Sequence, residues 1–165
     1  MKQIFVISIL ISFFITNCAS FPKTEKTQLQ IRAFQTRTYD ITESKLILKA
    51  VLNVLQDDGF IVKNAVPEIG LLTATKEIDI EKEIESIPAF LFGGTAASWI
   101  KSSIIDATCN ISDFGDKYKV RVNFTQKILD NRGNIVQIRQ IDDQKFYQTF
   151  FTKLDKSIYL QKTGL

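Results

Sequence analysis

The chain contains no histidine, the side chain that most often serves proteins as a general base or as a metal ligand. It has two cysteines, and the sequence offers no base that would activate the internal one, Cys109, as a nucleophile. The Gly93-Gly94 pair lacks the lysine and the spacing of a phosphate-binding loop. These absences predict a protein that is not an enzyme and that holds no metal or cofactor.

The carboxylates offer two adjacent pairs, Asp57-Asp58 and Asp142-Asp143. Neighbouring side chains at the end of a helix point in different directions, so we expect each pair to face solvent or to cap its helix. A hydrolase or transferase would need carboxylates that converge in space, which the order of residues alone does not reveal.

The balance of charge argues against nucleic acid as a partner. The formal net charge is +3 over 165 residues, and no run of basic residues alternates with aromatic ones. Apolar residues make up 45% of the chain and charged residues 24%, which is ordinary for one globular domain. We predict a single domain over residues 28–165.

The N-terminal residues 1–17 have the pattern of a signal peptide. Met1-Lys2 gives a charged start, and residues 4–15 are apolar apart from Ser8 and Ser12. A membrane-spanning helix needs about 20 apolar residues, so this segment is too short to cross a bilayer. We therefore leave it out of the fold prediction.

The leader ends in Ile15-Thr16-Asn17-Cys18, which resembles the acylation signal of bacterial lipoproteins, although Asn17 stands where a smaller residue is commoner. The resemblance implies that Cys18 carries the lipid and attaches the chain to a membrane of the cell envelope. Ala19, by analogy, favours the outer membrane, with the domain facing the periplasm. The alternative is a secreted protein in which Cys18 has no role. Residues 18–27 are polar and without periodicity, which predicts a short tether.

Residues 39–77 predict one helix followed by one hairpin. Asp40 is expected to cap the helix, with Glu43 three residues later. A single apolar stripe then follows at helical spacing, formed by Ile47, Ala50, Val51, Val54 and Leu55. Gly59 ends the helix, and strands over residues 60–66 and 71–77 are joined by the turn at 67–70.

The rest of the chain predicts four more strands and a last helix. We expect an edge strand over residues 28–38 and hairpin strands over 103–112, 118–125 and 135–140. The period of two in the second of these segments places Cys109 in the core, and with Cys18 acylated Cys109 has no disulfide partner. A helix after Asp142-Asp143 carries a core-facing row formed by Phe146, Phe150, Leu154 and Ile158, with Tyr147 and Phe151 beside it. The predicted fold is α+β, an antiparallel sheet of about six strands with two helices on one face.

Residues 87–100 are uncharged, contain Pro88 and Gly93-Gly94, and are too few to span a bilayer. One interpretation is a crossover that packs on the sheet. The other is an exposed apolar loop in which Phe90, Phe92 and Trp99 contact a membrane interface or a partner protein.

Several stretches give a family resemblance: QTRTYD, VLNVLQDDGFIVKNA, GLLTATKE, KVRVNF and FYQTFFTKLDKSIYLQK. Over residues 34–162 the chain resembles a family of small bacterial envelope lipoproteins, which implies an envelope location and no established activity. The order of elements is also similar to the helix-grip domains of an outer-membrane barrel-assembly lipoprotein. The predicted function is a non-catalytic accessory or protein-interaction module with an envelope protein as partner. The alternative is a binding module for a lipid or another apolar ligand, held in a cavity between helices and sheet.

Overall fold

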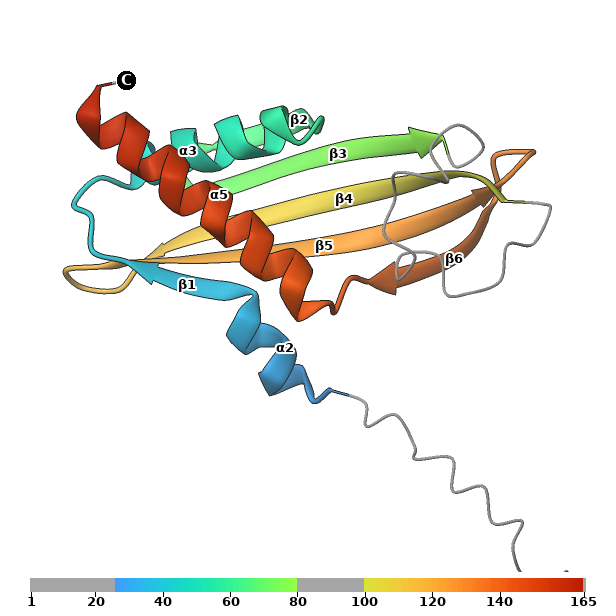
Figure 1. Ribbon diagram of the computed structural model, residues 1–165, viewed down its shortest axis with the longest axis horizontal. Coiled ribbons are helices and arrows are strands. Elements are labelled where there is room, and N and C mark those ends of the chain that lie inside the picture. The colour runs from blue at the N-terminus through green and yellow to red at the C-terminus, as the bar shows by residue number, and fades with distance from the viewer. Residues whose placement is uncertain (1–25, 80–99, 165) are drawn as a thin grey trace, which may run out of the picture.

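Figure 1 shows a computed structural model of the chain, which describes residues 26–79 and 100–164. The elements, in chain order, are α2 (Gln28–Phe34), β1 (Thr36–Tyr39), α3 (Ser44–Asp57), β2 (Ile61–Val66), the 3₁₀ turn η1 (Pro67–Ile69), β3 (Leu71–Asp79), β4 (Ile100–Asp113), β5 (Tyr118–Asp130), β6 (Ile135–Gln140) and α5 (Gln144–Thr163). The α+β class and the antiparallel six-stranded sheet predicted from the sequence are confirmed. The described residues hold three α-helices, one more than predicted.

One side of β5 is shared by two short strands. Its strand order is β1-β5-β4-β3-β2, and β6 also pairs with β5. β4 pairs with one side of β5 along its length, whereas the other side is shared between two short strands. β1 pairs with residues 118–121 of that side and β6 with residues 125–129. Figure 1 shows β1 and β6 one after the other beside β5.

The helices α3 and α5 lie across one face of the sheet (Figure 1) and contact each other, with the Ser157 hydroxyl donating to the carbonyl of Ala50 at 3.3 Å. Both predicted apolar rows are confirmed as core. The buried members are Ile47, Ala50, Val51, Val54 and Leu55 on α3, and Tyr147, Phe150, Phe151, Leu154 and Ile158 on α5; Phe146 is partly buried. Packing of these two rows against the sheet stabilises helices that would be marginal on their own.

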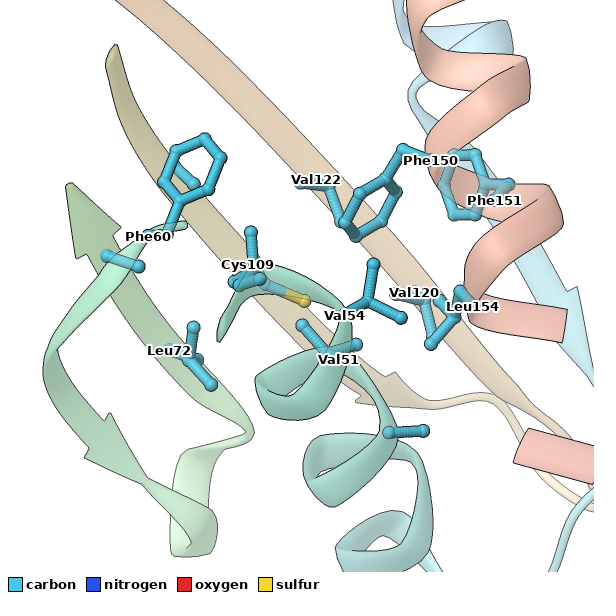
Figure 2. Close-up of a cluster of buried hydrophobic side chains, with 14 of the residues drawn as sticks. Val51, Val54, Phe60, Leu72, Cys109, Val120, Val122, Phe150, Phe151 and Leu154 are labelled. Carbon is cyan, nitrogen blue, oxygen red and sulfur yellow. The ribbon is translucent and has the colours of Figure 1, made fainter. Parts of the chain in front are cut away.

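Cys109 lies inside this core, as the period-two pattern predicted. Its side chain is 0% exposed; it lies on β4 opposite Leu72 of β3, and Figure 2 shows it within the cluster that also contains Val51 of α3. Burial raises the pKa of the Cys109 thiol to about 12, so the nucleophilic thiolate is scarce at neutral pH.

The prediction of a strand over residues 28–38 is wrong for residues 28–34. Residues Gln28–Phe34 form the helix α2, and only Thr36–Tyr39 pair with the sheet, as an edge strand. The helix begins with a capping box in which Thr27 accepts from the N–H of Gln30 at 3.3 Å and the Gln30 side chain accepts from the N–H of Thr27 at 2.8 Å. This reciprocal pair satisfies backbone donors that a strand would have to pair with another strand.

The predicted capping role of Asp40 is also wrong. The residue before the first turn of α3 is Glu43, which is extended, and its side chain makes no capping hydrogen bond. Ile41 is 7% exposed and belongs to the core cluster, so the chain continues towards the core before it turns into the helix. Burial of an apolar side chain here outweighs an exposed cap.

The other predicted boundaries agree with the structure within a few residues. Gly59 follows the last residues of α3 with φ 81°, and β2 and β3 form the predicted hairpin. β6 spans the predicted residues, whereas β5 continues five residues beyond Thr125 to Asp130. Asp143 caps α5, accepting from the N–H of Phe146 at 2.7 Å.

Candidate functional site

The sequence-predicted site residues lie outside the part of the chain that the structure describes. Cys18 precedes residue 26, and Phe90, Phe92 and Trp99 fall between residues 79 and 100. The lipid anchor and both interpretations of residues 87–100 therefore stay predictions. No helix among the described residues is both long enough and apolar enough to cross a membrane.

The carboxylate pairs have structural contacts. Asp58 forms an ion pair with Lys153, which ties the end of α3 to α5, and Asp143 caps α5. In residues 26–79 and 100–164, no group of three or more His, Cys, Asp or Glu side chains could hold a metal ion.

Aromatic rings fill the space between α5 and the sheet. The ring of Phe124, on β5, lies 4.9 Å from that of Phe146, 5.4 Å from that of Phe150 and 5.6 Å from that of Tyr147. These tilted and edge-to-face contacts are typical of a packed core. The aromatic row of α5 therefore belongs to the core. It fills the space between helix and sheet in which the alternative prediction placed an apolar ligand.

The gap between β1 and β6 is closed by Tyr147. Its hydroxyl accepts from the backbone N–H of Phe124 at 3.2 Å and from the side-chain amide of Gln35 at 3.0 Å. On either side of this contact, Val122 donates to the carbonyl of Gln35 and Ile141 donates to the carbonyl of Phe124. A helix side chain thus completes the pairing of a β5 edge that neither short strand covers.

β6 carries the densest group of exposed apolar side chains among the described residues. Ile135 is 52% exposed, Val136 57% and Ile138 60%. Within the described residues, β6 pairs with β5 alone and is therefore an edge strand of the described sheet, with these apolar side chains along it. An edge of this kind is suited to pairing with a strand of another protein.

The opposite edge of the sheet, β2, differs from β6. Its pairing with β3 is interrupted by a bulge between Val62 and Asn64, and Lys63 is exposed there. Ile61 is an exposed large apolar residue of this strand. A bulge and a lysine are features by which proteins prevent strands from adding to an edge. The two edges therefore have different capacities for strand pairing.

The sheet face opposite α3 and α5 carries a polar row in its middle. On it, Asp106 accepts from the Thr75 hydroxyl at 2.8 Å and pairs with Lys127 at 2.6 Å, which links β3, β4 and β5. Burial acts to raise the pKa of Asp106, but the hydrogen bonds from Lys127 and Thr75 hold it below its usual value. Thr75, Asp106 and Lys127 thus form a polar row across this face.

A cavity of about 640 Å³ lies beside α2, where this short helix meets β1 and α5. Its lining residues are Lys26, Gln30, Ala33, Phe34, Thr36, Arg37, Gln144, Gln148 and Phe151. It lies at the margin of the helical layer, away from the packed contact between α5 and the sheet. Its volume falls in the range of small-molecule sites.

Sequence reasoning missed both the β6 edge and this cavity. The edge had a signal in Ile135-Val136, because adjacent strand residues point to opposite faces and only one can enter a core. The cavity had none, because its wall depends on α2 being a helix and joins residues more than a hundred positions apart.

No protein-family model matches the chain, and no curated protein matches its sequence. Two solved structures have a distant likeness of fold. A TBP-like protein from Parabacteroides distasonis is 11% identical with a TM-score of 0.40, over 75% of this chain and 90% of that chain. A DUF4468 family protein from Bacteroides ovatus is 8% identical with a TM-score of 0.37, over 74% of this chain and 84% of that chain. A likeness at this level concerns the arrangement of the elements and says nothing about function.

Proposed function

We propose that this chain is a non-catalytic interaction module of the bacterial cell envelope, an outer-membrane lipoprotein that faces the periplasm. Cys18 anchors it, and the outer edge of β6 pairs with an extended strand of another envelope protein. The observation that supports the interaction is the exposure of Val136 and Ile138, at 57% and 60%, on a strand with a single neighbour in the described sheet.

Two contributions to binding coincide at the outer side of β6. An added strand could form backbone hydrogen bonds with the outer side of β6. It would also remove from water the apolar side chains of Val136 and Ile138, which alternate with Gln137 along the strand. Full burial of an aliphatic side chain contributes roughly 1.5–3 kcal/mol, and these two, already partly buried, would each contribute less than that to the contact.

The membrane attachment is supported by the leader and by the length of the tether. Eight peptide units separate Cys18 from Lys26, the first residue that the structure describes, and they extend to at most about 29 Å. A domain on so short a tether stays at the membrane surface, where its partners would be membrane-bound or close to the membrane.

Site-specific photo-crosslinking in cells tests the interaction. A photoreactive residue at position 138 should give one dominant adduct, whereas the same residue at position 49, exposed on α3, should give none. Replacing Val136 by Lys should abolish the adduct from position 138, because a charge would enter the apolar contact. Equal adducts from positions 138 and 49, or an adduct insensitive to Val136→Lys, would refute the β6 interface.

Mass spectrometry of the native protein tests the anchor separately. We expect residues 1–17 to be absent and Cys18 to carry the mass of its acyl groups. A Cys18→Ala variant should lose the lipid, and a bare Cys18 in the native protein would refute membrane attachment.

A further inference from the structure

The cavity beside α2 has cations and apolar surface but no acid in its lining. Its two charged lining residues are Lys26 and Arg37, and its other polar lining side chains are Thr36 and three glutamines. Ala33, Phe34 and Phe151 supply apolar surface to the same wall. The combination of cations, amide donors and apolar carbon is complementary to an amphiphile with an anionic head.

Each cation lies over an aromatic ring. The ammonium nitrogen of Lys26 is 5.2 Å from the ring centre of Phe34, and the guanidinium carbon of Arg37 is 4.9 Å from that of Phe151. Second contacts fix them further, because Lys26 donates to the carbonyl of Asp142 and Arg37 pairs with Asp155 through Nη1. The two cations are therefore held near the cavity before any ligand binds, which lowers the entropic cost of binding.

Both cations keep hydrogen-bonding capacity for a ligand. An ammonium group has three N–H donors and a guanidinium five, and the hydrogen bonds described above use one N–H of Lys26 and one of Arg37. Phosphate oxygens accept such charge-assisted hydrogen bonds from both kinds of group. Gln144 and Gln148, exposed on the first turns of α5, can add neutral donors.

We infer that this cavity binds the phosphate headgroup of an anionic phospholipid. The headgroup phosphate would lie between Lys26 and Arg37, and the glycerol and first acyl carbons would lie against Ala33, Phe34 and Phe151. The choice of a lipid rests on the proposed function, because the short tether would keep Lys26 within about 29 Å of the acylated Cys18. The site differs in place and chemistry from an apolar cavity between helices and sheet.

Native mass spectrometry of the full chain, released from nonionic detergent, tests this inference. Titration with phosphatidylglycerol should give one retained lipid per chain, with at least tenfold weaker retention of phosphatidylcholine. Lys26→Glu should weaken retention of phosphatidylglycerol at least tenfold, because it replaces a cation of the cavity by an anion. Lys49→Glu, an equal change of charge on the exposed side of α3, should leave retention unchanged.

A second variant guards against a loss caused by altered folding near the start of α2. Gln148→Glu keeps Lys26, Arg37 and the aromatic wall but introduces a carboxylate at an exposed helix position, and it should weaken retention in the same way. Far-UV circular dichroism should show both variants folded. Equal retention of the two lipids, or equal losses in Lys26→Glu and Lys49→Glu, would overturn the inference.

Competition with inorganic phosphate separates a lipid site from a general anion site. Millimolar phosphate should displace little phosphatidylglycerol, because it cannot use the apolar wall. Full displacement at that concentration would overturn the assignment to a lipid. The same spectra report whether Cys18 is acylated. An acylated chain that retains no phosphatidylglycerol would refute this inference and leave the proposed anchor standing. A chain without acyl groups at Cys18 that still retains phosphatidylglycerol would refute the proposed anchor alone.

Discussion

The hydroxyl of Tyr147, on α5, accepts a hydrogen bond from the backbone N–H of Phe124, in the middle of β5, at 3.2 Å. The contact falls on β5 between the residues paired with β1 and those paired with β6. A helix side chain therefore accepts the backbone hydrogen bond that a neighbouring strand would otherwise accept. It couples the helical layer to the sheet edge through a polar bond inside an apolar core, where a lost bond is costly to stability.

Removing this hydroxyl should destabilise the domain. Tyr147→Phe keeps the buried ring but leaves the Phe124 N–H without its acceptor, which costs roughly 1–3 kcal/mol of unfolding free energy. Tyr159→Phe on the same helix is the control, because Tyr159 is 64% exposed, and it should change stability by less than about 0.5 kcal/mol. Denaturant unfolding measures both. Equal stability of the two variants would show that the Tyr147 hydroxyl contributes nothing.

A side chain at Gly70 should destabilise the domain. Its φ is +63°, and a Cβ built there would lie 2.2 Å from the carbonyl oxygen of Ile111, whose N–H donates to Gly70. Gly133 also has a positive φ, +83°, but open space around its Cβ position. Gly133→Ala should therefore cost only the left-handed backbone, about 1–2 kcal/mol.

Gly70→Ala adds a backbone clash to the same conformational cost, so it should destabilise by about 1–3 kcal/mol more than Gly133→Ala. Thermal unfolding of the two variants side by side measures the difference. A difference near zero would mean that η1 and β4 can move apart to make room for the added Cβ without a cost in stability.

Acid should weaken the link between β3, β4 and β5. The pKa of Asp106 is lowered in the folded state, where the opposing effect of burial is outweighed by the hydrogen bonds from Lys127 and Thr75. The stability that this carboxylate contributes is therefore present above its unfolded pKa and is lost as the pH falls through the folded one. Asp106→Asn should flatten the acidic limb of a plot of stability against pH. If the acidic part of the curve is unchanged in that variant, other groups are responsible for the loss of stability at low pH.

The uncharged segment outside the described residues gives a further prediction. If Phe90 and Trp99 contact a partner or a membrane interface, the double change to Asp should abolish cellular crosslinks while leaving the unfolding midpoint unchanged. If the segment packs on the sheet instead, the same change should lower the midpoint, because charges would enter an apolar contact. Crosslinking and thermal unfolding of one variant therefore separate the two interpretations.

The sequence predicted those parts of the fold in which local signals and burial agree. The stripe of α3 and the period of two around Cys109 each combine a local preference with a core-facing pattern, and the turn that ends in Gly70 follows from its Pro and Gly; all three are present in the structure. It failed for α2, where a single buried residue, Ile31, left no periodicity to detect and the capping box of Thr27 decided the conformation.

The candidate sites were harder to predict because they depend on tertiary placement. Lys26 and Gln148 come together because α2 lies against α5, and no spacing along the chain encodes that contact. The exposed edge of β6 follows from β1 pairing with the other end of β5. The sequence predicted both strands but not that they share a neighbour.

Division of one strand side between β1 and β6 has a dynamic consequence. A hairpin bound through a single partner can fray without disturbing the remainder of the sheet. The amide protons that join β6 to β5 should therefore exchange with solvent through local opening. Those between β4 and β5 should exchange only when the whole domain unfolds. The molecule would then carry its most adaptable strand at the margin of a rigid centre.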